Sequence, residues 1–129
     1  MIDILVVDDS RLARKRTIET ISEFDIEHSI LAEADDGVEA LDKFKELKPN
    51  LIITDIEMPN MDGMELVNEI RKVDTKVNII IISSLSNEQV KQTVKSDKFT
   101  EFVKKPMDKK IVQMLLLKLE HQLVKGVTG

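Results

Sequence analysis

The sequence contains no cysteine, tryptophan or tyrosine, and its only aromatic residues are four phenylalanines. Without cysteine the chain can form no disulfide and offers no thiolate ligand for a zinc or iron–sulfur site. So few aromatic rings leave little surface on which nucleic-acid bases could stack. Any metal site in this chain must therefore rely on ligands other than sulfur.

Long hydrophobic runs and a basic charge excess are missing as well. No purely apolar run is longer than that of Ile79–Ile82, whereas a bilayer-spanning helix needs about 20 apolar residues. The N-terminus lacks the basic start and apolar core of a signal peptide. The net charge is −5 and both signs are interspersed, which argues against binding DNA through a basic surface. These features predict a cytoplasmic protein that neither inserts into a membrane nor binds DNA directly.

Glycine is scarce, with residues only at positions 37, 63, 126 and 129. Their spacing contains no G-x-G-x-x-G motif and no Walker A loop. A flavin or nucleotide carrier is therefore disfavoured.

Short apolar runs alternate with longer segments of helical periodicity. This alternation predicts βαβ units, hence an α/β fold with a mainly parallel sheet and helices on both faces. The 129 residues suit a single domain over residues 1–129. The expected strands are Ile2–Val7, Ser29–Ala34, Leu51–Thr54, Asn78–Ile82 and Thr100–Lys104, and the expected helices are about Arg11–Glu23, Val38–Leu47, Met64–Lys72, Asn87–Ser96 and Lys109–Lys125.

Polar residues stand where four of these strands end. Asp8 and Asp9 follow the first strand, Asp55 the third, Ser83 the fourth and Lys105 the fifth. Ligands bind outside the carboxyl ends of the strands in an open parallel sheet. If the first and third strands are neighbours, three carboxylates, a hydroxyl and an ammonium group converge there.

Three close carboxylates cannot all stay ionised without a cation between them. Hard oxygen ligands favour Mg²⁺, with Mn²⁺ as a second possibility. Asp55 could then attack phosphorus as a nucleophile, while Lys105 and Ser83 contact phosphoryl oxygens. Two of these assignments have competitors: Ser84 next to Ser83, and Lys104 next to Lys105. Strand alternation sends the two lysines to opposite faces, and Lys105 is preferred because it precedes a proline.

The segment after the first strand allows simpler interpretations. An acidic or hydroxyl residue caps a helix well, so Asp9 or Ser10 could serve as an N-cap, but capping needs one such residue and not an acidic pair. A basic cluster opens the same helix and forms either an exposed helical face or a surface for docking a kinase or phosphotransfer domain. Its members are Arg11, Arg14, Lys15 and Arg16.

Four motifs in order, VVDDS, TDIEMPNMDG, IIISS and FVKKP, resemble those of the response regulator receiver domains of two-component systems, in particular the stand-alone chemotaxis type. The resemblance covers essentially the whole chain and implies a flavodoxin-like (βα)5 fold with strand order 2-1-3-4-5. It also implies a cis peptide before Pro106. The implied roles are Asp8 and Asp9 as Mg²⁺-binding acids, Asp55 as phosphoacceptor, Glu57 as metal ligand through its backbone carbonyl, Ser83 as switch hydroxyl, Lys105 as phosphoryl-neutralising lysine and Phe102 as rotating aromatic.

The resemblance implies a signalling switch and not a metabolic enzyme. Asp55 would accept a phosphoryl group from a sensor histidine kinase or a phosphotransfer domain, and self-phosphorylation and self-dephosphorylation would be the only catalysis. The output face would comprise the fourth helix, the fifth strand and the fifth helix. Lys98 and Phe99 stand before that strand where the family commonly has Gly-Ala.

The fifth helix has more apolar residues than one buried stripe needs. Ile111, Leu115 and Leu119 are expected in the core, and the excess either broadens the core face or forms a partner or dimer surface. The excess residues are Leu116, Leu117 and Leu123.

The alternative function is a Mg²⁺-dependent phosphatase of the haloacid-dehalogenase type, which also uses a strand-end aspartate. That family requires an aspartate two residues after the nucleophile, where this chain has Glu57, and places its nucleophile after the first strand. A turnover assay with a simple phosphate ester would separate the two functions.

Overall fold

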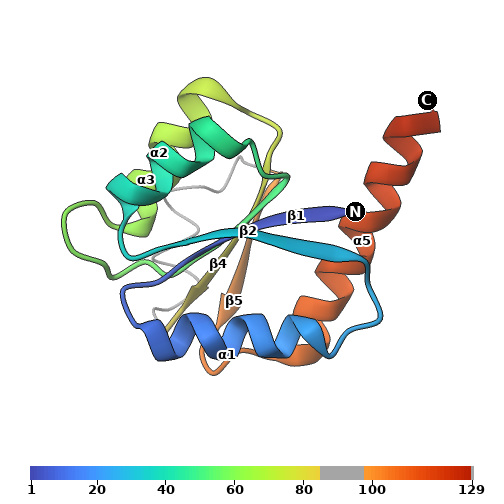
Figure 1. The fold of residues 1–129 in the computed structure, drawn as a ribbon, viewed down its shortest axis with the longest axis horizontal. Coiled ribbons are helices and arrows are strands. Elements are labelled where there is room, and N and C mark those ends of the chain that lie inside the picture. The colour runs from blue at the N-terminus through green and yellow to red at the C-terminus, as the bar shows by residue number, and fades with distance from the viewer. Residues whose placement is uncertain (85–97, 129) are drawn as a thin grey trace.

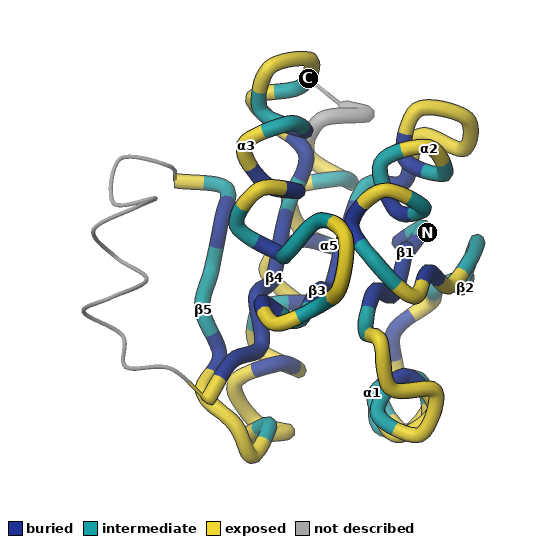
Figure 2. The backbone as a smooth tube through the Cα atoms, turned by 90° about the vertical axis from the view of Figure 1, so that its left-hand side faces the viewer, coloured by how far each residue is buried: buried dark blue, intermediate teal, exposed yellow. Residues whose placement is uncertain are grey.

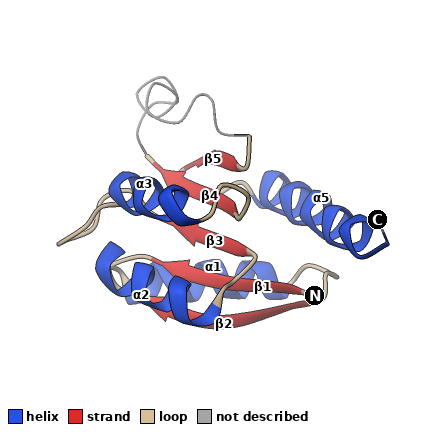
Figure 3. Ribbon diagram, turned by 90° about the horizontal axis from the view of Figure 1, so that it is seen from above, coloured by secondary structure: helices blue, strands red, loops and turns tan. Residues whose placement is uncertain are grey.

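The computed structural model describes residues 1–84 and 98–128. Five parallel strands form one sheet in the order β2-β1-β3-β4-β5, which confirms the predicted α/β class and strand order. Helices lie on both faces of the sheet (Figures 1 and 3). The elements are β1 (Ile2–Val7), α1 (Arg11–Ser22), β2 (His28–Ala34), α2 (Gly37–Leu47), β3 (Leu51–Thr54), α3 (Gly63–Val73), β4 (Asn78–Ser83), β5 (Thr100–Lys104) and α5 (Lys109–Thr128).

Each predicted strand is present, and the predicted bounds differ from the observed ones by only a few residues at the ends. The same holds for the helices that the structure describes. The expected helix Asn87–Ser96 lies outside the described residues. Within the described ranges, no helix combines the length and apolar character that crossing a bilayer requires.

Alternation along the strands divides the core into two layers. In β1, Leu5 and Val7 pack in the layer that α2 and α3 cover, whereas Ile4 and Val6 pack in the layer that α1 and α5 cover. In Figure 2 the buried colour covers most of the central strands, and exposed residues lie mainly on the helices and loops. Because both faces are covered, strands with almost continuous apolar sequences are stable in the interior.

The orientation of α5 differs from the one expected. Val112, Leu116 and Leu119 are fully or almost fully buried, so the expectation for Leu119 is confirmed and Leu116 belongs to the core and not to a surface excess. Ile111 is 40% exposed and Leu117 is 46% exposed, so the expectation that Ile111 lies in the core was wrong. The number of apolar residues cannot reveal which side of a helix meets the sheet, because several rotations bury similar areas.

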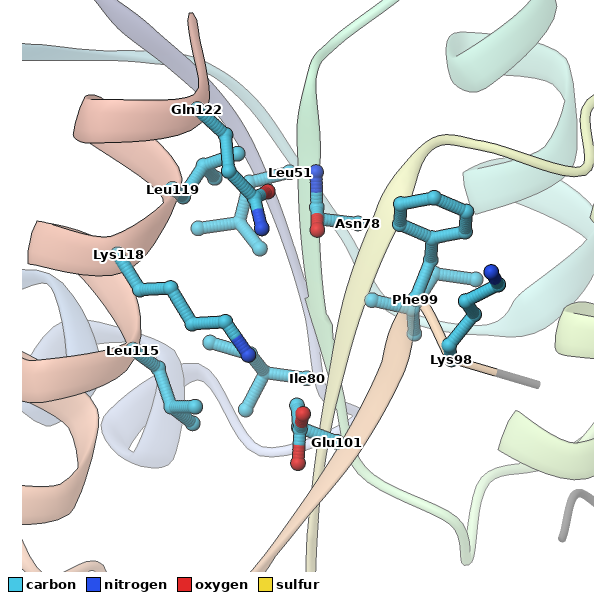
Figure 4. A pocket seen from close by; sticks show the side chains of 11 residues that line it. Leu51, Asn78, Ile80, Lys98, Phe99, Glu101, Leu115, Lys118, Leu119 and Gln122 are labelled. Atoms are coloured by element: carbon cyan, nitrogen blue, oxygen red, sulfur yellow. The ribbon is translucent and has the colours of Figure 1, made fainter.

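A small cavity lies between α5 and the sheet, toward the amino ends of the strands. Figure 4 shows Leu115, Lys118, Leu119 and Gln122 of α5 on one side, with Phe99 across from them. Its volume of about 30 Å³ corresponds to little more than one water molecule. This cavity is too small for a ligand.

The loop from β3 to α3 comes very close to the strand end that precedes it. The backbone N–H of Gly63 donates to the carbonyl oxygen of Ile56 at 2.8 Å. A Cβ atom on Gly63 would overlap the carbonyl oxygen of Asp55 and would lie 2.9 Å from the Cα atom of Ile56. Both are backbone atoms, so only glycine fits this position without moving the end of β3.

We predict that Gly63→Ala lowers the free energy of unfolding by about 2 kcal/mol, because the new methyl group displaces backbone atoms. Urea denaturation measures this loss. Asn68→Ala, on the exposed side of α3, is the control and should stay within about 0.5 kcal/mol of the original protein. Equal stabilities of the two variants would contradict the close approach.

A pair of substitutions tests the orientation of α5. Leu116→Ala should lower the free energy of unfolding by about 3 kcal/mol, because it leaves a cavity in the core. Leu117→Ala should change it by less than about 0.5 kcal/mol, because that side chain is largely in solvent. Thermal or urea unfolding of the two variants decides the matter, and a larger loss at Leu117 would overturn the orientation.

Candidate functional site

Three carboxylates meet at the carboxyl edge of the sheet. Asp8 and Asp9 follow β1, and Asp55 follows β3, which pairs directly with β1. Each side chain offers one oxygen, and these oxygens lie within 4.8 Å of one another. The predicted convergence of the three acids is therefore confirmed, and adjacency of the two strands is its cause.

Asp55 is held in a defined orientation. Its backbone N–H donates to the carbonyl oxygen of Val7 at 3.1 Å, and its Oδ1 accepts from the backbone N–H of Ile56 at 2.7 Å. Its Oδ2 lies 3.2 Å from Nζ of Lys105, and only 12% of its side chain is exposed. One carboxylate oxygen is thus tied to the loop, and the other faces a cation.

Lys105 is the lysine that reaches the site, as predicted. Lys104 ends β5 and is exposed, whereas Nζ of Lys105 makes the ion pair with Asp55. The peptide bond between Lys105 and Pro106 is cis, which confirms the second expectation for this segment.

The acidic pair also connects to the start of α1. Oδ1 of Asp8 accepts from the backbone N–H of Ser10 at 2.9 Å, and Oγ of Ser10 accepts from the backbone N–H of Ala13 at 3.1 Å. Ser10 is therefore the N-cap, which resolves the choice between Asp9 and Ser10. The carboxylate of Asp9 is exposed and free of this capping task.

The environment of Asp8 disfavours its charged form. Burial raises the pKa of Asp8 above its ordinary value of 3.8, although the N–H of Ser10 opposes the rise, and the nearby charge of Asp55 adds to it. Lys105 lowers the pKa of Asp8, whereas a hydrogen bond with Asp9 raises it. Burial is the largest cause of the raised pKa, and neighbouring negative charge adds to it. A bound cation would favour the charged form of Asp8.

Ser83 and Phe102 lie on the neighbouring strands β4 and β5. Ser83 is buried at the end of β4, while Ser84 after it is exposed. Phe102 pairs with Ile81 in the sheet and packs, half-buried, against the core layer of α2 and α3. Glu57 is exposed in the loop after β3. All these residues belong to the edge that carries the acids or to the strands leading to it.

A cavity of about 330 Å³ opens beside the acids, between the sheet and α1. Its walls combine apolar strand residues with charged groups, including Arg16 of α1 and Lys105. A group of phosphoryl size could therefore reach Asp55 from solvent.

Arg14 lies next to the site, where the sequence predicts an exposed or docking residue. It was grouped with an exposed or docking cluster, but its side chain is only 11% exposed and contacts the ends of β1 and β2. Arg11, Lys15 and Arg16 are exposed. A signal did exist, because Arg14 shares one helix face with Ile18 and Ile21, at spacings of four and seven residues, and that face packs on the core.

The donor set suits a hard divalent cation. All three convergent ligands are carboxylate oxygens, and oxygen ligands in small number are typical of Mg²⁺. The acids could therefore hold such an ion.

The raised pKa of Asp8 predicts a pH-dependent stability. Between 3.8 and the raised value, the folded protein binds more protons than the unfolded chain, so stability falls as the pH rises through this interval. Asp8→Asn removes that cost, and the melting temperature of the metal-free protein near neutral pH should rise on the order of 2 °C, since Asp8 is only half-buried. The gain should vanish below about pH 4. Melting curves across pH measure it; a lower melting temperature near neutral pH would contradict it.

Comparison with known proteins identifies the family to which the chain belongs. The sequence profile of the response regulator receiver domain matches residues 4–116. The chemotaxis protein CheY of Halobacterium salinarum is 37% identical over 107 residues, which cover 82% of this chain and 86% of that protein. A protein-glutamate methylesterase/protein-glutamine glutaminase of Methanospirillum hungatei is 35% identical over 125 residues, which cover 95% of this chain. The chain spans only 36% of the length of that relative.

Solved structures of receiver domains and related proteins have the same fold. The crystal structure of the CheX–CheY–BeF3–Mg²⁺ complex from Borrelia burgdorferi superimposes with a TM-score of 0.80 at 30% identity and covers 92% of this chain and 88% of that one. The N-terminal domain of a protein from Wolinella succinogenes gives a TM-score of 0.82 at 29% identity, over 97% of this chain and 99% of that one. On these grounds the chain belongs to the response regulator receiver domain family of two-component signalling proteins.

Proposed function

We propose that the chain is a phosphorylation-controlled switch in which Asp55 accepts a phosphoryl group from a phosphohistidine on a sensor histidine kinase or phosphotransfer domain. The observation that carries this proposal is the pairing of Oδ2 of Asp55 with Nζ of Lys105 at 3.2 Å, within reach of two further carboxylates. Proteins accept phosphoryl groups with little covalent chemistry beyond alignment and charge neutralisation. The ion pair with Lys105 together with a bound cation would supply both.

Asp55 is better suited to this reaction than its acidic neighbours. Its Oδ1 is tied to the backbone of Ile56, so Oδ2 is the oxygen positioned to attack. The new bond joins Oδ2 to phosphorus, the phosphorus–nitrogen bond of the donor breaks, and the departing imidazole takes up a proton. Lys105 then stays close to the transferred group, where its ammonium offsets the added negative charge.

Mg²⁺ is the proposed cofactor, and Mn²⁺ would serve the same ligands. Asp8, Asp9, Asp55 and the backbone carbonyl of Glu57 would hold the ion. When bound, the ion would neutralise carboxylate and phosphoryl oxygens during transfer. The carboxylates contribute ligands at fixed positions because the strand ends that carry them are packed into the sheet. The crystal structure from Borrelia burgdorferi, with BeF3 and Mg²⁺, supports this part of the proposal.

Ser83 and Phe102 are the proposed switch. Ser83 would donate its hydroxyl to a phosphoryl oxygen, and Phe102 would rotate in response. The rotation would couple the site to an output face that includes β5 and α5; the helix expected at Asn87–Ser96, which the resemblance adds to that face, lies outside the described residues. A downstream protein would bind that face. The switch is a two-state equilibrium, and the new phosphoryl contacts would favour one state.

The phosphatase alternative is not favoured. Asp55 follows β3 and not the first strand, and the residue two positions later is Glu57 where that family requires aspartate. The profile of the receiver domain, in contrast, matches most of the chain. In this proposal the chain is a signalling domain, and its own phosphorylation and dephosphorylation are its only catalysis.

Mass spectrometry after incubation with acetyl phosphate and Mg²⁺ tests the proposal. The protein should gain the mass of one phosphoryl group, and Asp55→Asn should abolish the gain because the amide is not a nucleophile. Asp42→Asn removes an exposed carboxylate of α2 and should leave the gain intact. An unmodified wild-type protein, or equal labelling of Asp55→Asn, would refute the assignment.

A further inference from the structure

A buried guanidinium stands next to the acidic site. In the part of the chain whose side chains are described, Arg14 is the one charged residue that counts as buried, beside Thr54, Ser83 and Thr100. Burying a charge is costly unless it is paired and hydrogen-bonded. Arg14 must therefore make polar contacts that its exposed neighbours on α1 do not need.

The guanidinium makes three polar contacts. Its Nε donates to Oε1 of Glu33 at 3.0 Å, and its Nη1 lies 2.7 Å from Oδ1 of Asp35. The same Nη1 donates to the backbone carbonyl oxygen of Asp8 at 2.6 Å. Glu33 belongs to β2 and Asp35 follows it, so Arg14 joins the carboxyl ends of β1 and β2 to α1.

The contact with Asp8 is made to the backbone, and this choice of atom matters. The carbonyl of Asp8 belongs to the peptide group that connects Asp8 to Asp9. On the other side of the same residue, the N–H of Asp8 donates to the carbonyl oxygen of Ala34 at 3.1 Å. The peptide planes before and after the Cα atom of Asp8 are thus both fixed. Fixing them sets the direction in which the Asp8 side chain leaves the chain, and it places the Cα atom of Asp9 beside it.

We propose that Arg14 is a positioning residue for the divalent cation: it holds the Asp8–Asp9 peptide in the orientation that lets both carboxylates face the same ion. The inference rests on the Mg²⁺ site of the proposed function. Partners that orient metal ligands commonly change metal affinity by about 10- to 100-fold when they are removed. Arg14 itself touches neither the ion nor the phosphoryl group and acts through Asp8.

Glu33 and Asp35 fix the guanidinium in its place. A planar fork can serve several acceptors in set directions, whereas an ammonium group is a single point charge. A lysine at position 14 would keep the charge but could not match the directions of all three acceptors. Arg14→Lys therefore separates orientation from charge.

Orientation and charge predict changes of opposite sign. If Arg14 acted only as a nearby cation, its removal would make the site more negative, and Mg²⁺ would bind more tightly. If Arg14 positions the ligands, its removal weakens Mg²⁺ binding. The direction of the change thus distinguishes the two roles without any measurement of phosphorylation.

Isothermal titration calorimetry with Mg²⁺ near neutral pH carries out the test on the full chain. Arg14→Met and Arg14→Lys should each raise the Kd for Mg²⁺ by about 10-fold or more. Lys15→Met removes the same charge from an exposed neighbouring position and should leave the Kd within about 2-fold, since exposed charges are screened. Circular dichroism and melting curves without metal establish that each variant is folded, and Arg14→Lys answers the question if Arg14→Met does not fold.

The outcomes separate this inference from the function on which it rests. An unchanged or lower Kd in folded Arg14→Lys overturns the positioning role, and so does an equal loss in Lys15→Met. A wild-type protein without affinity for Mg²⁺ overturns the positioning role together with the metal site. A protein that binds Mg²⁺ but gains no phosphoryl group on Asp55 refutes the proposed phosphoacceptor function and leaves the role of Arg14 standing if the Kd changes as expected.

Discussion

Electrostatic repulsion among Asp8, Asp9 and Asp55 is the constraint that determines what the site can bind. Their carboxylate oxygens lie within 4.8 Å of one another. The strands that carry them are packed into the core, so the carboxylates cannot move far apart. Burial and neighbouring charge raise the pKa of Asp8, and the ammonium group of Lys105 pairs with Asp55. A folded protein tolerates such a site because stability elsewhere compensates, and the strain favours the binding of a cation and the chemistry that a cation permits.

The two-layered core supplies that compensating stability. The central strands bury side chains on both faces, and the helices on each side contribute the opposing surface. Because the core is close-packed, the strand ends are rigid and present their polar residues at defined positions. Gly63 shows how tight this arrangement is, since its backbone approaches that of Asp55 so closely that no side chain fits. The loop that follows Asp55 is thus packed against the strand that carries this residue.

Much of this arrangement could be predicted from single residues and short patterns. Apolar runs identified the strands, and the positions of Asp8, Asp55 and Lys105 at strand ends predicted that they would converge. One prediction failed where the rotation of a helix mattered, because Ile111 was expected in the core and is 40% exposed. For Leu116 the sequence left core and surface open, and the structure places it in the core. Both outcomes depend on how α5 meets the sheet, which the apolar character of the residues does not determine. Arg14 was misjudged for a related reason: a charged residue is exposed by default, and only its partners on β1 and β2 make burial favourable.

The sequence by itself determined the fold class, the order of elements along the chain and the chemical identity of the site, because hydrophobic periodicity and strand-end residues are local properties. Tertiary structure decided which strands are neighbours, which face of α5 is buried, and that the guanidinium of Arg14 binds the peptide between two acidic residues. Such contacts join residues far apart in the chain, as with Arg14 and Glu33. Their energies depend on distance and burial, which no local pattern contains.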